Sequence, residues 1–148
     1  MPVRHITGDL FTAGIPVIGH GVNCQGVMGS GIAPEFKRRY PNMYQAYKNQ
    51  CRAGKLTLGH MYPYPNHDGV TVLNLATQHK TGPNADLTAI HTSLTEAIRY
   101  CEQNNITEFA IPRIGAGIGG LNWADVNNAI NSVGASTSVT ITVVTLPQ

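Results

Sequence analysis

A glycine-rich segment follows the second apolar run of the sequence and has the composition of an anion-binding loop. Gly26, Gly29 and Gly31 fall within six residues, between a β-branched run and a segment with helical spacing. Glycine lets the backbone bend sharply and approach a ligand closely, and the N–H groups that open the next helix present the positive end of its dipole. These residues predict a cradle for phosphate, and a flexible loop without a ligand is the alternative.

A second glycine-rich segment, residues 114–120, repeats this arrangement. It contains Gly115, Gly117, Gly119 and Gly120, again follows an apolar run and again precedes a helical pattern. In open α/β sheets, ligands lie beyond the carboxyl ends of the strands, where both segments would converge. Two cradles suit a diphosphate better than a single phosphate.

Two familiar nucleotide-binding motifs fit the sequence less well. Residues 115–120 formally satisfy the dinucleotide-binding pattern, but no acidic residue follows about 20 positions later. Neither glycine segment ends in Gly-Lys-Ser/Thr, with which P-loop enzymes contact nucleotide phosphates and magnesium. A Rossmann dehydrogenase and an ordinary ATPase are therefore disfavoured.

The histidines and cysteines do not indicate a metal site. The six histidines show no spacing such as His-Glu-X-X-His, and the three cysteines include no Cys-X-X-Cys pair. This pattern favours reduced thiols, and Cys24 is interpreted as a small packing residue. We expect neither a metal nor a cofactor.

The order of strands and helices would bring both glycine segments to one edge of a sheet. β-Branched runs predict strands at 3–7, 15–22, 56–62, 70–75, 107–112 and 138–146. Helical spacing predicts helices within 32–52, divided at Pro41, and at 86–104 and 123–133, with Asn84 or Asp86 capping the second of these segments. This alternation favours an α/β fold with a largely parallel sheet and helices on both faces.

Length and composition favour a single globular domain over residues 1–148. Apolar residues make up 42% of the chain and charged residues 12%, which excludes a disordered protein. No apolar run approaches the roughly 20 residues of a membrane helix, and the amino terminus lacks a signal-peptide pattern. We expect a cytoplasmic protein with no membrane partner.

The charge distribution is uneven although the net charge is only +2. Six of the ten basic residues lie in the segment 37–55, where Tyr40, Tyr44 and Tyr47 are interleaved with them. A solvated helix face beside an anionic ligand site fits this pattern, and so does a surface that binds a polyanion.

Three motifs occur in a fixed order along the chain: Gly8-Asp9-Leu10-Phe11, Asn23 through Ala33, and Ile111 through Trp123. In this order they resemble the macrodomain family. The resemblance spans essentially the whole chain and is closest to the branch with the terminal ADP-ribose protein glycohydrolase, the DNA-ADP-ribose hydrolases of toxin–antitoxin systems, and small stand-alone phage and bacterial proteins. It implies a three-layer α/β/α fold with a central mixed, largely parallel sheet, and a site for ADP-ribose.

The resemblance also implies a role for individual residues. Asp9 would accept a hydrogen bond from the adenine amino group, with Leu10 beside the ring. Asn23 would orient the distal ribose while another group, such as the substrate's own phosphate, activates a water. The implied contacts with the diphosphate and distal ribose come from Gly29, Ser30, Gly31, Ile32, Ile114, Gly115, Ala116, Gly117, Ile118 and Gly119.

The catalytic residues of the closest branch are not matched. The glycohydrolase in that branch uses a lysine after the fourth strand and an aspartate in the second glycine loop, where this chain has Gln78 and Gly119. A mechanism through a covalent lysine is therefore disfavoured at that position. Besides Asn23, the catalytic candidates are Lys80 as a Schiff-base nucleophile and His79 as a base, with simple solvation as the alternative for both.

Three functions fit these observations. The first is hydrolysis of ADP-ribosyl linkages on protein, nucleic acid or a metabolite such as ADP-ribose 1''-phosphate. The second is a reader that binds ADP-ribose without chemistry, and the third is a nucleic-acid-binding module that uses the segment 37–55. The expected partner is ADP-ribose or an ADP-ribosylated substrate, with ADP-ribosylated nucleic acid as a combined possibility. We expect a monomer.

Overall fold

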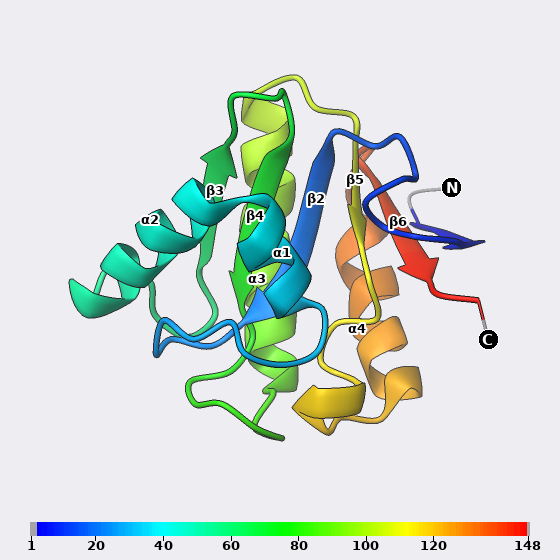
Figure 1. Ribbon diagram of the computed structural model, residues 1–148. Helices are drawn as coiled ribbons and strands as arrows, with labels where there is room; N and C mark the ends of the chain where they lie inside the picture. Colours follow the sequence, from blue (N-terminus) through cyan, green and yellow to red (C-terminus); the bar gives the residue numbers. More distant parts are fainter. Residues whose placement is uncertain (1–2, 148) are drawn as a thin grey trace.

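The computed structural model describes residues 3–147, so the expected domain limits at 1 and 148 lie outside the described residues. Strands and helices alternate through most of the chain (Figure 1). Their order is β1 (Val3–Thr7), β2 (Val17–Val22), α1 (Ala33–Arg39), α2 (Pro41–Arg52), β3 (Met61–Pro65), β4 (Thr71–Ala76), α3 (Leu87–Gln103), β5 (Glu108–Ile111), a 3₁₀ turn η1 (Gly117–Gly119), α4 (Trp123–Gly134) and β6 (Thr140–Thr145).

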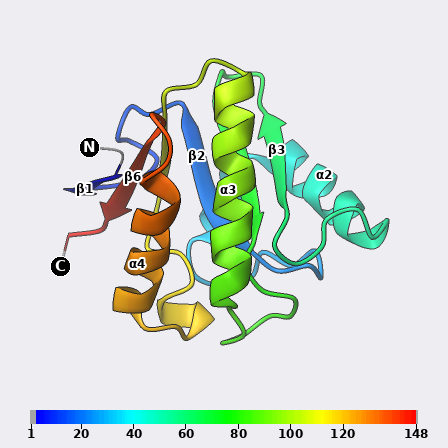
Figure 2. The same cartoon turned by 180° about the vertical axis from the view of Figure 1, so that it is seen from behind.

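The strands form one six-stranded sheet in the order β1-β6-β5-β2-β4-β3. Among the described strands only β3 is antiparallel to its neighbour, and all other pairs are parallel. Helices α1 and α2 lie on one face of the sheet in Figure 1, and α3 and α4 cover the opposite face in Figure 2. The expected three-layer fold with a mixed, largely parallel sheet is confirmed, and the carboxyl ends of the parallel strands meet at one edge.

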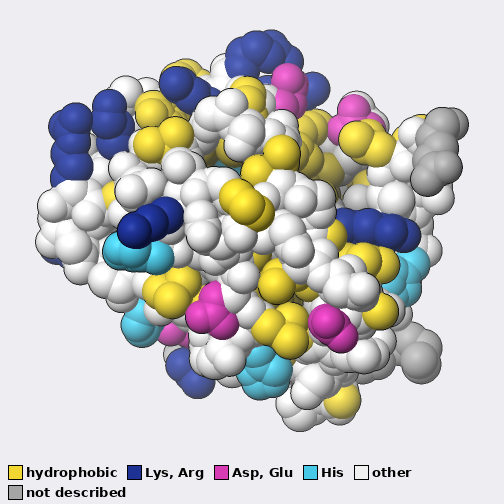
Figure 3. Space-filling view, turned by 90° about the horizontal axis from the view of Figure 1, so that it is seen from below, with side chains coloured by type: hydrophobic (Ala, Val, Ile, Leu, Met, Phe, Trp, Pro, Cys, Tyr) yellow, Lys and Arg dark blue, Asp and Glu magenta, His cyan; other side chains and the backbone are white. Residues whose placement is uncertain are grey.

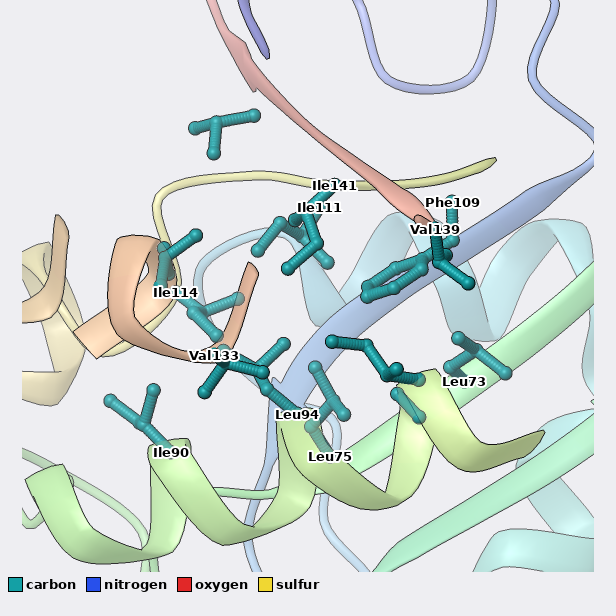
Figure 4. Packing of buried hydrophobic residues seen from close by; sticks show 14 of the residues in the cluster. Leu73, Leu75, Ile90, Leu94, Phe109, Ile111, Ile114, Val133, Val139 and Ile141 are labelled. Atoms are coloured by element: carbon teal, nitrogen blue, oxygen red, sulfur yellow. The ribbon is translucent and has the colours of Figure 1, made fainter. Parts of the chain in front are cut away.

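Buried apolar side chains form one cluster on each face of the sheet. Along β4, Leu73 and Leu75 belong to the cluster under α3 and α4, whereas Val72 belongs to the cluster under α1 and α2. In Figure 4, Leu75 lies close to Leu94 of α3 within the first cluster. Because successive side chains of a strand point to opposite faces, a central strand buried on both sides reads as a continuous apolar run.

A polar pair is buried between the sheet and α1. His20 of β2 is fully buried, its Nε2 lies 2.9 Å from Asn74 Oδ1, and its ring stacks on Phe36 with centroids 3.8 Å apart. Since Asn74 Nδ2 donates to the Tyr62 carbonyl at 3.1 Å, Asn74 Oδ1 faces His20 and accepts from it. Burial lowers the pKa of His20 to about 4, and the hydrogen bond with Asn74 acts in the opposite direction. His20 is neutral near pH 7.

The helices begin where the sequence predicts. Pro41 is the first residue of α2, directly after the break that ends α1, and Asp86 Oδ1 accepts from the N–H of Thr88 at 2.9 Å as the cap of α3.

No helix within residues 3–147 is long and apolar enough to cross a membrane.

Two strand predictions need correction. The segment 56–62 was expected to be a strand, but β3 covers Met61–Pro65 and most of the expected segment is a loop. Gly59, at φ +85°, turns the chain before it reaches the sheet. Pro63 lies within β3, beyond the end of the expected strand, and an edge strand tolerates its missing N–H. The expected strand 15–22 begins two residues later, at the start of β2.

Candidate functional site

Two adjoining cavities, together called the cleft, lie along the sheet edge at which the parallel strands end. The inner cavity has a volume of about 680 Å³ and the outer cavity about 660 Å³. Most lining segments directly follow β1, β2, β4, β5 or β6, and Figure 3 views the molecule from below, onto this edge. The two cavities adjoin, since both are lined by Gly31, Ile32, Pro112, Arg113 and Leu146.

The first glycine loop, residues 23–31, is held in place by the side chain of Asn23. Asn23 Oδ1 accepts from the N–H of Gln25 at 3.0 Å and of Val27 at 3.3 Å, and Asn23 Nδ2 donates to the Val27 carbonyl at 2.8 Å. The hydroxyl of Tyr47, from α2, lies 2.7 Å from the Asn23 carbonyl oxygen and 3.0 Å from its Oδ1. One amide and one buried tyrosine therefore order the start of this loop.

The second glycine loop, residues 114–120, packs its backbone closely against α3 and faces the first loop. Gly115 has φ +75°, which strains any residue with a Cβ, and a Cβ there would lie 2.5 Å from Ile90 Cδ1, so the buried Ile90 side chain would have to shift. Ile118 is 54% exposed, and its Cγ1 lies 3.7 Å from the point that a Cβ of Gly31 would occupy. The two glycine loops thus approach each other across the inner cavity.

Backbone groups, rather than charged side chains, dominate the inner cavity. Among its described lining residues, Arg113 alone carries an ionisable side chain. The Arg113 guanidinium lies 4.8 Å from the ring centroid of Trp123, and its Nε donates to Thr145 Oγ1 at 3.2 Å. The inner cavity therefore suits an anion, and its described lining includes no carboxylate, imidazole, ammonium or thiol.

Comparison with known proteins identifies the family of this chain. Residues 20–130, most of the chain, match the Macro domain family. The chain belongs to the macrodomain family. The macrodomain of Mycobacterium tuberculosis DarG has the same fold with a TM-score of 0.88 and 35% identity, covering 99% of this macrodomain and 98% of that one.

Two sequence relatives differ in how much of their length this macrodomain covers. A DNA ADP-ribosyl glycohydrolase of Mycobacterium tuberculosis is 38% identical over 137 residues, which is 88% of this chain but 38% of that protein. This macrodomain therefore spans well under half the length of that relative. An uncharacterized 17.5 kDa protein of Enterobacteria phage T4 is 33% identical over 95% of this macrodomain and 96% of its own length.

The residues predicted to contact a ligand all line the cleft of this macrodomain. Asp9 and Leu10 line the outer cavity, and Asn23 lines the inner one. Their contacts with a ligand stay predictions, but the fold brings them together. The other predicted residues, all lining the inner cavity, are Gly29, Ser30, Gly31, Ile32, Ile114, Gly115, Ala116, Gly117, Ile118 and Gly119.

Asp9 lies in an ordered corner of the outer cavity. Its Oδ1 accepts from the N–H of Phe11 at 2.8 Å, while Leu10 beside it is buried. The Phe11 ring packs edge-on against Phe36 with centroids 4.8 Å apart, and the Arg39 guanidinium lies 4.5 Å from the Phe11 centroid. One oxygen of Asp9 holds the turn, and the other accepts no hydrogen bond from the described residues, so it is available to an outside donor.

Lys80 and His79 are exposed and do not line either cavity. Their backbone is tied down: Gln78 Nε2 donates to the Lys80 carbonyl at 2.6 Å and to the Gly82 carbonyl at 2.8 Å, and the N–H of Cys24 donates to the His79 carbonyl at 3.1 Å. The turn presents Gln78 to the cleft and the two predicted catalytic side chains to solvent. Their roles stay predictions that require this turn to rearrange.

Several lining residues were not predicted from the sequence. Arg113 directly precedes the second glycine loop, and no role was predicted for it from the sequence. Thr77, Thr81 and Gly82, which follow β4, also line the inner cavity. Their position in the chain could have predicted this, because in a parallel sheet the segment after β4 must lie beside both glycine loops.

Cys24 is a half-buried packing residue, in agreement with its interpretation from the sequence. Burial, and secondarily the neighbouring Cys51, raises the pKa of the Cys24 thiol to about 11. The thiol is protonated near neutral pH and is therefore a poor nucleophile.

Proposed function

We propose that this chain binds ADP-ribose between the two glycine loops and hydrolyses an ADP-ribosyl linkage. The observation that carries the proposal is that both loops face one cleft with Asp9 at its outer end. The diphosphate would lie among the backbone N–H groups, the adenine beside Asp9, and the distal ribose at the far end of the inner cavity near Asn23. The names of similar proteins, which include DNA ADP-ribosyl glycohydrolase, support the same chemistry.

Hydrolysis in this cleft would proceed without a charged base from the described inner lining. A guanidinium has hydrogen-bond donors and no acceptor, so Arg113 cannot take a proton from a water. Asn23 would help to orient the sugar, and the substrate's own phosphate would activate the water that attacks the ribose carbon. Lys80 or His79 would take part only after the turn that carries them rearranges.

Calorimetric titration with ADP-ribose tests the binding claim. We expect Asp9→Ala to weaken binding by about 10-fold or more, because a charge-assisted hydrogen bond contributes about 1.5–3 kcal/mol. Asp9→Asn is the matched control, since its side-chain oxygen can still accept from the N–H of Phe11 and thus keep the turn. A parent protein that fails to bind at millimolar ADP-ribose would overturn the proposal.

A hydrolysis panel tests the catalytic claim. The substrates are an ADP-ribosylated oligonucleotide, an ADP-ribosylated protein and ADP-ribose 1''-phosphate, each compared with Lys80→Ala and His79→Ala variants. Turnover that survives in both variants supports the mechanism without a charged base. Loss of turnover with unchanged ADP-ribose affinity in one variant would instead assign that residue to catalysis.

A second function, an ADP-ribose reader without chemistry, is favoured by the lack of a carboxylate, imidazole, ammonium or thiol in the described lining of the inner cavity. The resemblance to the glycohydrolase implies a catalytic lysine and aspartate at the positions of Gln78 and Gly119, and both of these residues line the cavity. ADP-ribose binding without turnover of any substrate in the panel would establish the reader and exclude the hydrolase.

We further propose that the ADP-ribosylated substrate is a nucleic acid that lies along a basic surface beside the first glycine loop. The ammonium groups of Lys37 and Lys48 lie 4.6 and 6.0 Å from the ring centroid of Tyr44, whose hydroxyl donates to the Gly26 carbonyl at 3.2 Å. Dark-blue basic side chains gather along the upper and left margins of Figure 3, and Glu35 is the only acidic residue between positions 26 and 67.

Variants of the basic surface distinguish a nucleic acid substrate from a protein substrate. Lys37→Ala with Lys48→Ala should weaken binding of an ADP-ribosylated oligonucleotide and reduce its salt dependence, while the affinity for free ADP-ribose stays unchanged. Equal effects on both ligands would contradict the assignment.

We also propose that residues 1–148 act as one macrodomain unit and as a monomer, which sedimentation can test.

A further inference from the structure

The side chain of Gln78 has a fixed orientation at the inner end of the cleft. Its Nε2 donates to the carbonyl oxygens of Lys80 at 2.6 Å and Gly82 at 2.8 Å. A carboxamide nitrogen has two hydrogens, so both are used within the turn that follows β4. Because two carbonyl oxygens can only accept, the amide cannot flip without losing both bonds.

The carboxamide oxygen of Gln78 therefore points away from its own turn and lies next to the second glycine loop. Gln78 Oε1 lies 3.7 Å from the point that a Cβ of Gly119 would occupy, and both residues line the inner cavity. No described residue donates a hydrogen bond to this oxygen, and it is not among the buried unpaired polar atoms. It is a free acceptor that remains accessible from the cleft.

The position of this acceptor matches one part of ADP-ribose, on the basis of the proposed function. With the adenine beside Asp9 and the diphosphate between the glycine loops, the distal ribose reaches the end of the cavity lined by Asn23, Thr77, Gln78 and Thr81. Ribose hydroxyls are hydrogen-bond donors and need acceptors when they lose water on binding.

Asn23 is a weaker source of such an acceptor in this structure. Its Oδ1 already accepts from the N–H groups of Gln25 and Val27 and lies 3.0 Å from the Tyr47 hydroxyl. An amide oxygen has two lone pairs, so little accepting capacity remains. Only one hydrogen of Asn23 Nδ2 is left beside the bond to Val27, which makes Asn23 a donor toward a ligand.

We propose that Gln78 is the residue that recognises the distal ribose, with its Oε1 accepting a hydrogen bond from a ribose hydroxyl. Gln78 thereby acts as a neutral substrate-binding group at the position where the resemblance to the glycohydrolase implies a lysine. An amide is not a base, so this contact orients the sugar and transfers no proton.

Two ligands, ADP-ribose and ADP, isolate this contact because ADP lacks the distal ribose. Gln78→Met keeps the length of the side chain and removes the acceptor. We expect it to weaken ADP-ribose binding by about 2- to 10-fold, the value of one neutral hydrogen bond, and to change ADP binding by less than about 2-fold. Both affinities are measured by calorimetry on the full chain.

Gln78→Met also removes the two bonds that order the turn, so a control for turn order is needed. Asn84→Ala serves this purpose, because Asn84 Nδ2 donates to the Thr81 carbonyl at 2.6 Å but Asn84 does not line the cavity. Asn84→Ala should affect both ligands equally or not at all. Selective loss of ADP-ribose affinity in Asn84→Ala as well would overturn the assignment, as would an unchanged ADP-ribose affinity in Gln78→Met.

The outcome for the parent protein separates this inference from the proposed function. A parent that binds neither ligand would refute the proposed function and this inference with it. A parent that binds ADP-ribose no more tightly than ADP would leave the diphosphate site in place and overturn the role of Gln78 alone.

Discussion

Replacing Asn23 by alanine should lower the stability of the whole fold as well as ligand affinity. Asn23 is 9% exposed, and its side chain pairs with two N–H groups and one carbonyl of its own loop. Each partly buried group that loses its partner costs about 1 kcal/mol, at the lower end of the usual range because water can reach this loop from the cleft. The free energy of unfolding should therefore fall by about 2–3 kcal/mol.

Urea unfolding followed by circular dichroism measures this loss, with Tyr47→Phe as the matched variant. The hydroxyl of Tyr47 contacts both the carbonyl and Oδ1 of Asn23, so its removal should cost about 1–2 kcal/mol. The double variant should be less destabilised than the sum by about 0.5–1 kcal/mol, because the two side chains share one contact. An Asn23→Ala protein within about 0.5 kcal/mol of the parent would refute the capping role.

The same variant separates two ways in which Asn23 can influence ADP-ribose. If disorder of the first glycine loop is the cause, affinity falls for ADP and ADP-ribose together, because in the proposed binding mode both place a diphosphate on that loop. If Asn23 acts only by contact with the distal ribose, the affinity for ADP stays unchanged. The bonding of its amide within the loop favours the first result.

Three further predictions follow from single features. Because folded His20 has its pKa lowered to about 4 while an unfolded histidine titrates near 6.5, its contribution to stability is present above pH 6.5 and is lost as the pH falls toward 4. The loss should total about 3 kcal/mol in pH-dependent urea unfolding, and a His20 ring that titrates above pH 6 by NMR would contradict it. Gly115→Ala should lower the free energy of unfolding by about 2–4 kcal/mol, because its φ is +75° and a Cβ there would lie 2.5 Å from Ile90 Cδ1. Gly29→Ala is the control, and it should leave the melting temperature nearly unchanged because the nearest contact of its Cβ would be at 3.6 Å. Any hydrolysis should show a flat pH–rate profile from about 6 to 9, since the described inner lining holds no carboxylate, imidazole, ammonium or thiol, and a rate that changes about 10-fold across this range would contradict the mechanism without a charged base.

The fold could be predicted from the sequence wherever one local signal decided the structure. β-Branched runs predict the central strands, and Pro41 predicts the break between the first two helices. The prediction of a strand at 56–62 was wrong because the apolar residues of this segment fit a strand and a loop that buries Leu56 equally well. Only pairing with β4 decides where β3 begins, and that register is a non-local property.

The candidate site was predictable to the extent that it is made of backbone. Glycines mark the places where the chain must turn sharply or approach another group, and position after a parallel strand places both loops at one edge. The direction of a side chain in a loop carries no comparable signal. Lys80 faces solvent and Gln78 faces the cleft because of hydrogen bonds to Gly82 and to the first glycine loop, which the order of residues does not reveal.

This division between backbone and side chains explains how a macrodomain can keep its ligand while its chemistry changes. In the proposed binding mode, backbone N–H groups would hold the diphosphate in any sequence that preserves the strand ends and the glycines at tight positions such as Gly115. Discrimination at the distal ribose would depend instead on a few side chains, which we propose to be the neutral amides of Asn23 and Gln78. A change of Gln78 would therefore alter how the distal ribose is recognised with little effect on the diphosphate site, whereas a change of Asn23 would also disturb the first glycine loop. Substrate preference should therefore vary among relatives more readily than ADP-ribose affinity, and it should follow the residue after β4 rather than the glycine loops.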